Sequence, residues 1–197
     1  MPEDPRLARW LAALVATPGL TSIRDTARAR RVHLDDSLRV LPLLEEFAGP
    51  LVDVGSGGGA PGIPLAAALP GREVTLLEAS RRKCDALELM SVEFPNVRVV
   101  WGRAEEQEPD SYGIAVAKAL AAPAVAAEWC LPLVRPGGAA VLYVGPSARP
   151  EHVARAAEVL GSAPPEVHPG FLVLRKLRPS PAGFPRRSGV ARKRPLA

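Results

Sequence analysis

The stretch LVDVGSGGGAPGIPLAAAL, residues 51 to 69, constrains the fold more than any other part of the sequence. A short apolar run ends in a loop where four of the five residues from Gly55 to Gly59 are glycine, and an alanine-rich segment follows. We expect a buried strand and then a helix, because Pro61 and Pro64 lie in the first turn, where proline is tolerated. Such a loop between a strand and a helix lets a ligand approach the backbone.

The alternation of strand and helix continues beyond this loop. Apolar runs predict strands at 50–54, 73–78, 97–101, 114–120, 137–145 and 170–177, with helices at 60–69, 80–94, 121–134 and 149–161. Amphipathic spacing predicts two earlier helices, at 5–16 and 24–48. This order is typical of an α/β protein with a mostly parallel sheet covered by helices on both faces. We expect a helical extension at 1–48, a main domain at 49–178 and a basic tail at 179–197.

Charge is distributed unevenly along the chain. The net charge is +4, yet eight Lys and Arg residues lie from Arg175 onward and no Asp or Glu follows Glu166. Residues 1 to 174 therefore carry 17 basic against 21 acidic side chains. A basic end on a mildly acidic body favours a polyanionic partner. The alternative is a solvent-exposed basic end with no partner.

No part of the sequence predicts export or a membrane span. The first ten residues, MPEDPRLARW, lack the apolar stretch of a secretory signal. No apolar run reaches the roughly eighteen residues of a transmembrane helix. Cys84 and Cys130 fit neither a disulfide framework nor the spacing of metal ligands. We expect a cytoplasmic protein that holds no metal.

Two kinds of cofactor suit the glycine loop. Gly55, Gly57 and Ala60 satisfy the dinucleotide pattern G-x-G-x-x-G/A, so a nicotinamide-dependent oxidoreductase is one alternative. Asp53 lies inside the strand, where a dinucleotide site usually has an apolar residue, and a carboxylate there can support the loop and an ammonium group. Ser56 and Gly59 complete the loop. These features favour S-adenosylmethionine.

Acidic residues follow three successive predicted strands. Asp53 ends the first, Glu78 the second, and Glu105 lies after the third, beside Ala104. The carboxyl ends of parallel strands meet at one edge, so these residues are expected at one site. Glu78 is placed to bind the ribose hydroxyls, and Ala104 and Glu105 to bind the adenine edge. This set of acids predicts a methyltransferase.

The predicted acceptor atom follows from a motif that the sequence lacks. No Asn/Asp-Pro-Pro-Tyr/Phe stretch follows the strand at 114–120, where AKALAAP stands instead. Methylation of an amine needs groups that accept its N–H hydrogens, whereas guanine N7 already presents a lone pair. No general base is then needed, and positioning supplies most of the rate.

These residues resemble the bacterial 16S ribosomal RNA guanine-N7 methyltransferases (RsmG, also called GidB). The resemblance runs through GLTSIRD, HLDDSL, DVGSGGGAPGIPLA, VTLLEASRRK, GRAEE, AKALA, LPLVRPGG and FPRRSGVARKRPL, which span nearly the whole chain. It implies a Rossmann-like class I methyltransferase with a mostly parallel seven-stranded sheet, acting as a monomer on a guanine of the 530 loop. It also implies that Lys118 contacts the cofactor and positions the reaction, and that His33 lies near the RNA.

Some positions depart from the family pattern. Lys118 stands where arginine is usual, Val144 where lysine is usual, and Gly113 where aspartate is usual. They leave open a second alternative, a decayed homologue that binds RNA without transferring methyl groups.

The basic tail is the predicted RNA contact. Pro179, Pro181, Pro185 and Pro195 oppose regular helix, so we expect an extended segment beyond the sheet that forms the cofactor site. The side chains expected to meet phosphates are Arg186, Arg187, Arg192, Lys193 and Arg194.

Overall fold

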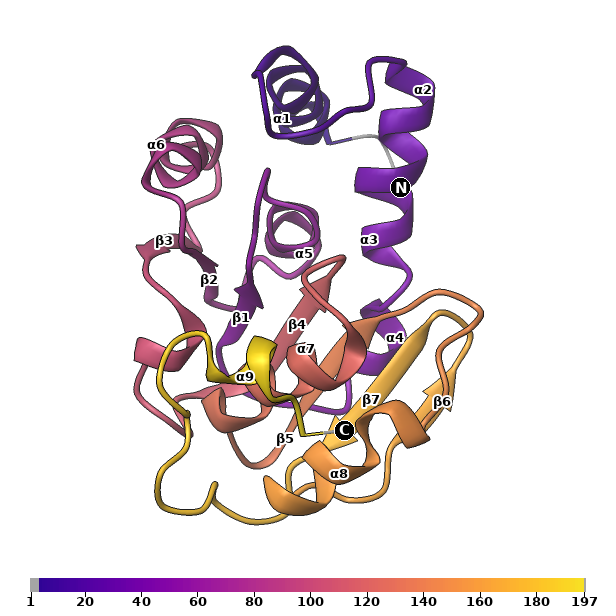
Figure 1. Cartoon of the computed structure of the whole chain (residues 1–197). Coiled ribbons are helices and arrows are strands. Elements are labelled where there is room, and N and C mark those ends of the chain that lie inside the picture. Colours follow the sequence, from indigo (N-terminus) through magenta and orange to yellow (C-terminus); the bar gives the residue numbers. More distant parts are fainter. Residues whose placement is uncertain (1–3, 197) are drawn as a thin grey trace.

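A seven-stranded sheet forms the centre of the computed structural model, with the order β3-β2-β1-β4-β5-β7-β6 (Figure 1). The structure describes residues 4–196, so residues 1–3 and 197, at the ends of the first and last predicted segments, lie outside it. The strands are β1 Leu51–Val54, β2 Val74–Glu78, β3 Val97–Trp101, β4 Tyr112–Lys118, β5 Val134–Tyr143, β6 Glu166–His168 and β7 Phe171–Arg175. The first five run parallel, and β7 runs antiparallel to β5 and β6. The predicted fold class is confirmed.

The short edge strand β6 is the one strand whose position the sequence pattern did not locate. It spans only three residues, and Val167 at its centre is exposed, so it has no apolar run. It pairs with β7 across the turn at Pro169 and Gly170, where glycine has a φ of +89°. A turn that needs this conformation favours glycine.

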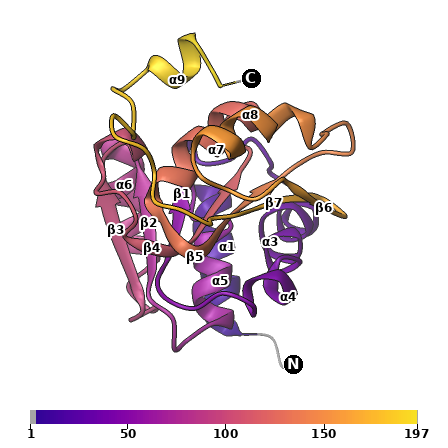
Figure 2. The ribbon, with the colours of Figure 1, turned by 90° about the horizontal axis from the view of Figure 1, so that it is seen from below.

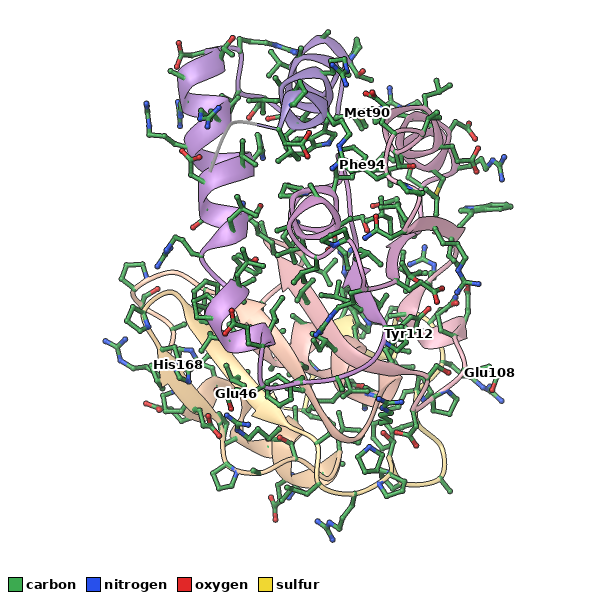
Figure 3. The ribbon with its side chains drawn as sticks, turned by 180° about the vertical axis from the view of Figure 1, so that it is seen from behind. Glu46, Met90, Phe94, Glu108, Tyr112 and His168 are labelled. Atoms are coloured by element: carbon green, nitrogen blue, oxygen red, sulfur yellow. The ribbon has the colours of Figure 1, made fainter. Side chains whose placement is uncertain are left out.

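Helices from the first half of the chain cover one face of the sheet. They are α1 Pro5–Ala16, α5 Gly62–Ala68 and α6 Arg81–Met90, with the short helices α2 Thr26–Ala29, α3 Asp36–Leu38 and α4 Leu41–Leu44. Their apolar side chains form one core with Leu51, Ile114 and Val116 of the sheet. Phe94 and Met90 extend this core between α6 and α1, as Figure 3 shows, and the Arg6 guanidinium lies 5.0 Å from the Phe94 ring centre.

Helices from the second half cover the other face. They are α7 Pro123–Cys130, α8 Glu151–Val159 and the short α9 Val190–Lys193. Figure 2 shows them across the sheet from α1, α3, α4 and α5. Their core includes Val52, Val54 and Ala115, so neighbouring residues of β1 point to opposite faces. Helices therefore cover both faces of the sheet, as the alternation of strands and helices predicted.

The predicted single helix at 24–48 is wrong in its second half. A helix begins after Asp25, whose carboxylate accepts the Arg28 N–H at 2.7 Å, and it includes a π-helical segment, Arg30–Asp35. It ends at Leu38, and α4 follows as a separate turn with Pro42 near its start. Proline lacks the N–H that would continue the helix, which accounts for the break.

Among residues 4–196, no helix is both long enough and apolar enough to cross a membrane. Cys84 and Cys130 are both buried and are not joined in a disulfide.

Candidate functional site

The glycine loop joins the end of β1 to α5, at the point where the strand order reverses. β1 pairs with β2 on one side and with β4 on the other. Gly55, Gly57 and Gly59 have φ values of +73°, +58° and +93°, which other residues rarely adopt. A Cβ at Gly55 would lie 2.3 Å from Leu120 Cδ1. The loop is therefore built from backbone at the edge where ligands bind in such sheets.

Asp53 lies behind this loop and is 1% exposed. Its Oδ2 accepts the N–H of Gly62, the first residue of α5, at 2.9 Å, while Oδ1 has no hydrogen-bond partner among the described residues. Burial raises the pKa of this carboxyl to about 7. Asp53 thus holds the helix against the strand, as predicted for loop support, but it does not line the cavity described next.

A cavity of about 290 Å³ opens at the carboxyl ends of β1, β2 and β3, near the lower limit of about 300 Å³ for ligand sites. Four of the predicted cofactor residues line it: Gly55, Glu78, Ala104 and Glu105. The others do not line it: Asp53, Ser56, Gly57, Gly59, Ala60 and Lys118. The wall also contains Leu120 and Trp129, which the sequence did not indicate, and Arg192, which was expected to contact RNA rather than the cofactor.

Glu78 connects the cavity to the glycine loop. Its Oε2 accepts the Gly57 N–H at 3.0 Å and its Oε1 accepts the Ser80 N–H at 2.8 Å. The side chain is largely buried, yet a carboxylate has about four lone-pair sites and keeps two for a ligand. Glu78 is therefore held in place and can still accept hydrogen bonds from a ligand.

Glu105 lies in the short helical turn Ala104–Glu106 after β3. Its Oε1 accepts the N–H of Gly189, a residue of the tail, at 3.1 Å. Trp129 of α7 lines the same cavity, and its buried indole N–H has no partner among the described residues. These groups offer a ligand a polar edge beside an aromatic ring.

Lys118 ends β4 and points toward the N-terminal helices. Its Nζ donates to the Val32 carbonyl and lies 3.1 Å from Asp36 Oδ2 and 3.4 Å from Ser37 Oγ. His33 belongs to the same region, with its Nε2 2.9 Å from Thr21 Oγ1. Burial and the nearby Lys118 charge lower the pKa of His33. The structure therefore brings these two predicted residues together, outside the first cavity.

A second cavity, of about 310 Å³, lies between β4, β5, α7 and α8. Its wall includes Ala117, Tyr143, Val144 and His152, and it shares Leu120 with the first cavity. Two adjoining cavities on either side of Leu120 suit a reaction between two bound molecules.

Two departures from the expected family pattern have local explanations. A Cβ at Gly113 would lie 1.9 Å from the Ala48 carbonyl oxygen, so this backbone excludes a side chain there. Val144 contributes an apolar side chain to the wall of the second cavity.

The prediction of an extended tail beyond the sheet that forms the cofactor site is wrong for the last residues of the tail. After Gly189, with φ +83°, the chain forms the turn α9, and Arg192 in this turn lines the first cavity. Arg186 does not extend into solvent but pairs with Glu128 of α7, which is 2% exposed. The remaining predicted phosphate contacts, Arg187, Lys193 and Arg194, are exposed.

The polar groups of the first cavity suit S-adenosylmethionine. Glu78 can accept hydrogen bonds from two hydroxyl groups. The backbone of the Ala104–Glu105 turn and the Trp129 N–H, which has no partner among the described residues, are polar groups for a base edge. Among residues 4–196, no group of three or more His, Cys, Asp and Glu side chains is arranged to hold a metal ion.

Comparison with known sequences gives one consistent description. The family described as "rRNA small subunit methyltransferase G" matches residues 5–168. A protein of that description from Synechococcus elongatus is 39% identical, over 90% of this chain and 82% of its own length. Those from Rubrobacter xylanophilus and Moorella thermoacetica are 41% and 35% identical, over 83% and 90% of this chain and 72% and 82% of their own.

Solved structures of low sequence identity share the fold. An O-methyltransferase from Thermotoga maritima matches with a TM-score of 0.59 at 15% identity, over 83% of this chain and 74% of its own. The 16S rRNA methyltransferase RsmC of T. thermophilus, in complex with AdoMet and guanosine, matches with a TM-score of 0.52 at 18% identity. The match covers 77% of this chain and 41% of that chain. Both are methyltransferases, so the likeness confirms the fold class.

Proposed function

The chain belongs to the rRNA small subunit methyltransferase G family, and on that premise we propose which residues hold its cofactor and which guanine it modifies. The protein is an S-adenosylmethionine-dependent methyltransferase that acts on N7 of a guanine in ribosomal RNA. This membership favours the methyltransferase over the nicotinamide-dependent alternative. We propose that the guanine lies in the 530 loop of 16S ribosomal RNA, in naked RNA or in a small ribosomal subunit.

The first cavity is the proposed cofactor site. The observation that carries this assignment is the position of Glu78, at the end of β2, with one oxygen on the glycine loop and its side chain in the cavity wall. In this proposal Glu78 accepts both ribose hydroxyls, Ala104 and Glu105 face the adenine, and Gly55 lets the cofactor approach the end of β1. Asp53, Ser56, Gly57, Gly59 and Ala60 hold the loop around it.

When bound, the cofactor supplies an electrophilic methyl group on a sulfonium. Guanine N7 carries no proton, so no side chain has to remove one. The chain therefore contributes orientation, by holding cofactor and base in line, and exclusion of water. Lys118 is a positioning residue in this proposal, because its bonds to Val32 and Asp36 fix the end of β4 against the N-terminal helices.

The second cavity is the proposed site of the target guanine. It lies at the carboxyl ends of β4 and β5 and meets the cofactor cavity at Leu120. His152 in its wall is a planar side chain on which a base can stack. His33 lies beside Lys118 and is proposed to approach the RNA from the N-terminal helices.

The surroundings of the reaction are also part of the proposal. Ribosomal RNA is a cytoplasmic substrate, which supports a cytoplasmic location. The proposed oligomeric state is a monomer.

Calorimetry with S-adenosylmethionine and with NAD(H) tests the assignment of the cofactor. We expect a heat of binding with S-adenosylmethionine and none with NAD(H). Heat with the dinucleotide alone would contradict the proposed use of the cavity.

A further inference from the structure

The C-terminal segment 184–196, here called the strap, folds back onto α7. Figure 1 and Figure 2 show its helix α9 beside α7. Ala191 is 2% exposed and belongs to the core on that face of the sheet. A basic segment bound only to RNA would not need this packing, so the contacts of the strap call for an explanation of their own.

Two successive residues of α7 hold the strap. Glu128 is buried and receives two hydrogen bonds from the Arg186 guanidinium, one of them 2.6 Å long from Nη2 to Oε2. The same carboxylate accepts the Leu196 N–H at 3.4 Å, and Arg186 also donates to the Arg194 carbonyl at 2.7 Å. Glu128 thus fixes both ends of the strap. Removing one member of a buried ion pair leaves the other charge unpaired, which makes the pair a strong tether.

The neighbouring residue Trp129 brings the strap to the proposed cofactor cavity. The Arg192 guanidinium lies 5.3 Å from the Trp129 ring centre, and both side chains line that cavity. The Gly189 N–H donates to Glu105 Oε1 at 3.1 Å, at the end of the cavity assigned to adenine. The strap therefore reaches the cavity through the Arg192 guanidinium and through the bond from Gly189 to Glu105.

We propose that the strap is one wall of the cofactor site, with Arg192 stacked on the adenine half, and that Arg186 is the positioning residue that holds it there through Glu128. The inference rests on the proposed cofactor site and assigns it a residue far from the glycine loop in sequence. A guanidinium stacks on aromatic faces, and Trp129 holds it from the other side. The basic end of the chain then serves the cofactor as well as the RNA.

Calorimetric titration of variants of the full-length protein tests this proposal, with S-adenosylmethionine and with adenosine as probes. Arg192→Ala removes an exposed side chain and is expected to weaken binding of both probes by about fivefold, the value of a cation–π contact. Arg186→Gln releases the strap and is expected to cause a similar loss. Because Arg186 acts through Arg192, the double variant should lose no more than the larger single loss.

Two controls separate the explanations. Arg178→Gln changes an exposed arginine just before the strap and should leave both affinities unchanged. Thermal unfolding of the cofactor-free proteins detects a purely structural role, in which Arg186→Gln lowers the melting temperature while both affinities match the wild type. That result, or wild-type affinity in Arg192→Ala, would overturn the proposal.

The Glu78→Ala variant separates this proposal from the cofactor assignment itself. If Glu78→Ala weakens binding and the strap variants do not, the cofactor site stands and the strap proposal is wrong. If the wild-type protein binds neither probe, both proposals are wrong. Losses in all three variants support both.

Discussion

The Gly57 N–H donates a hydrogen bond of 3.0 Å to Oε2 of Glu78, across the gap between the glycine loop and the end of β2. The second oxygen of the same carboxylate accepts the Ser80 N–H at 2.8 Å, just before α6. One side chain therefore joins the loop after β1 to the start of the helix after β2. A ligand bound to Glu78 would contact a group whose position both segments already fix.

The first prediction concerns Glu78. Glu78→Ala removes two charge-assisted hydrogen bonds to the ribose, each worth about 1.5–3 kcal/mol, so affinity for S-adenosylmethionine should fall at least about tenfold. Titration calorimetry measures the dissociation constant of S-adenosylmethionine. The control is Glu108→Ala, because Glu108 is an exposed acid on the loop before β4 (Figure 3). Equal dissociation constants for the Glu78 variant and the wild type would place the ribose elsewhere.

The second prediction concerns Lys118. Lys118→Ala should reduce kcat strongly, because the Nζ bonds to Val32, Asp36 and Ser37 position β4 against the N-terminal helices. Lys118→Arg keeps the charge and should retain activity. Methyl transfer to small-subunit RNA gives kcat, and calorimetry shows whether cofactor affinity changes with it. A fully active alanine variant would rule out a positioning role.

Sequence patterns identified most of the fold, because strands and helices depend on the spacing of apolar residues close together in the chain. Alternating apolar runs and helices fixed the parallel sheet, and the acids after β2 and β3 met at one edge, since parallel strands end together. The strap was not foreseeable in this way. Arg186 and Glu128 are 58 residues apart, and neither has a local pattern that indicates its partner. Glu128 lies in an apolar helix and Arg186 in a basic segment that was expected to contact RNA, so the sequence did not indicate that they would pair.

The third prediction concerns Asp53 and pH. Burial raises its pKa from the ordinary 3.8 to about 7, so between these values the folded state holds a proton that the unfolded state has lost. This residue therefore makes the protein less stable as pH rises from about 4 to about 7, by roughly 4 kcal/mol in total. Asp53→Asn should remove that fall while still accepting the Gly62 N–H.

Chemical denaturation of both proteins across this range measures the effect of Asp53. The free energy of unfolding of the wild type, minus that of the Asn variant, should decrease as pH rises. A constant difference would mean that the carboxyl titrates near its ordinary value in the folded protein.

The fourth prediction concerns the exposed basic residues of the strap. Arg187, Lys193 and Arg194 remain available to phosphates, whereas Arg186 and Arg192 are engaged within the protein. Replacing these three with glutamine should flatten the dependence of log affinity on log salt by about two to three units. Measuring RNA binding at several salt concentrations decides it. Superimposable salt curves would show that these three side chains do not contact RNA.

Methyl transfer to purified small-subunit ribosomal RNA, followed by mapping of the modified base, shows whether the protein methylates guanine N7 in the 530 loop. The naked RNA and the small subunit are compared as acceptors, and Glu78→Ala serves as the impaired enzyme. We expect one methyl group on N7 of a guanine in the 530 loop, formed at a much lower rate by the Glu78 variant at limiting cofactor. A protein that binds cofactor and RNA but transfers no methyl group, or that methylates a different atom, would contradict it.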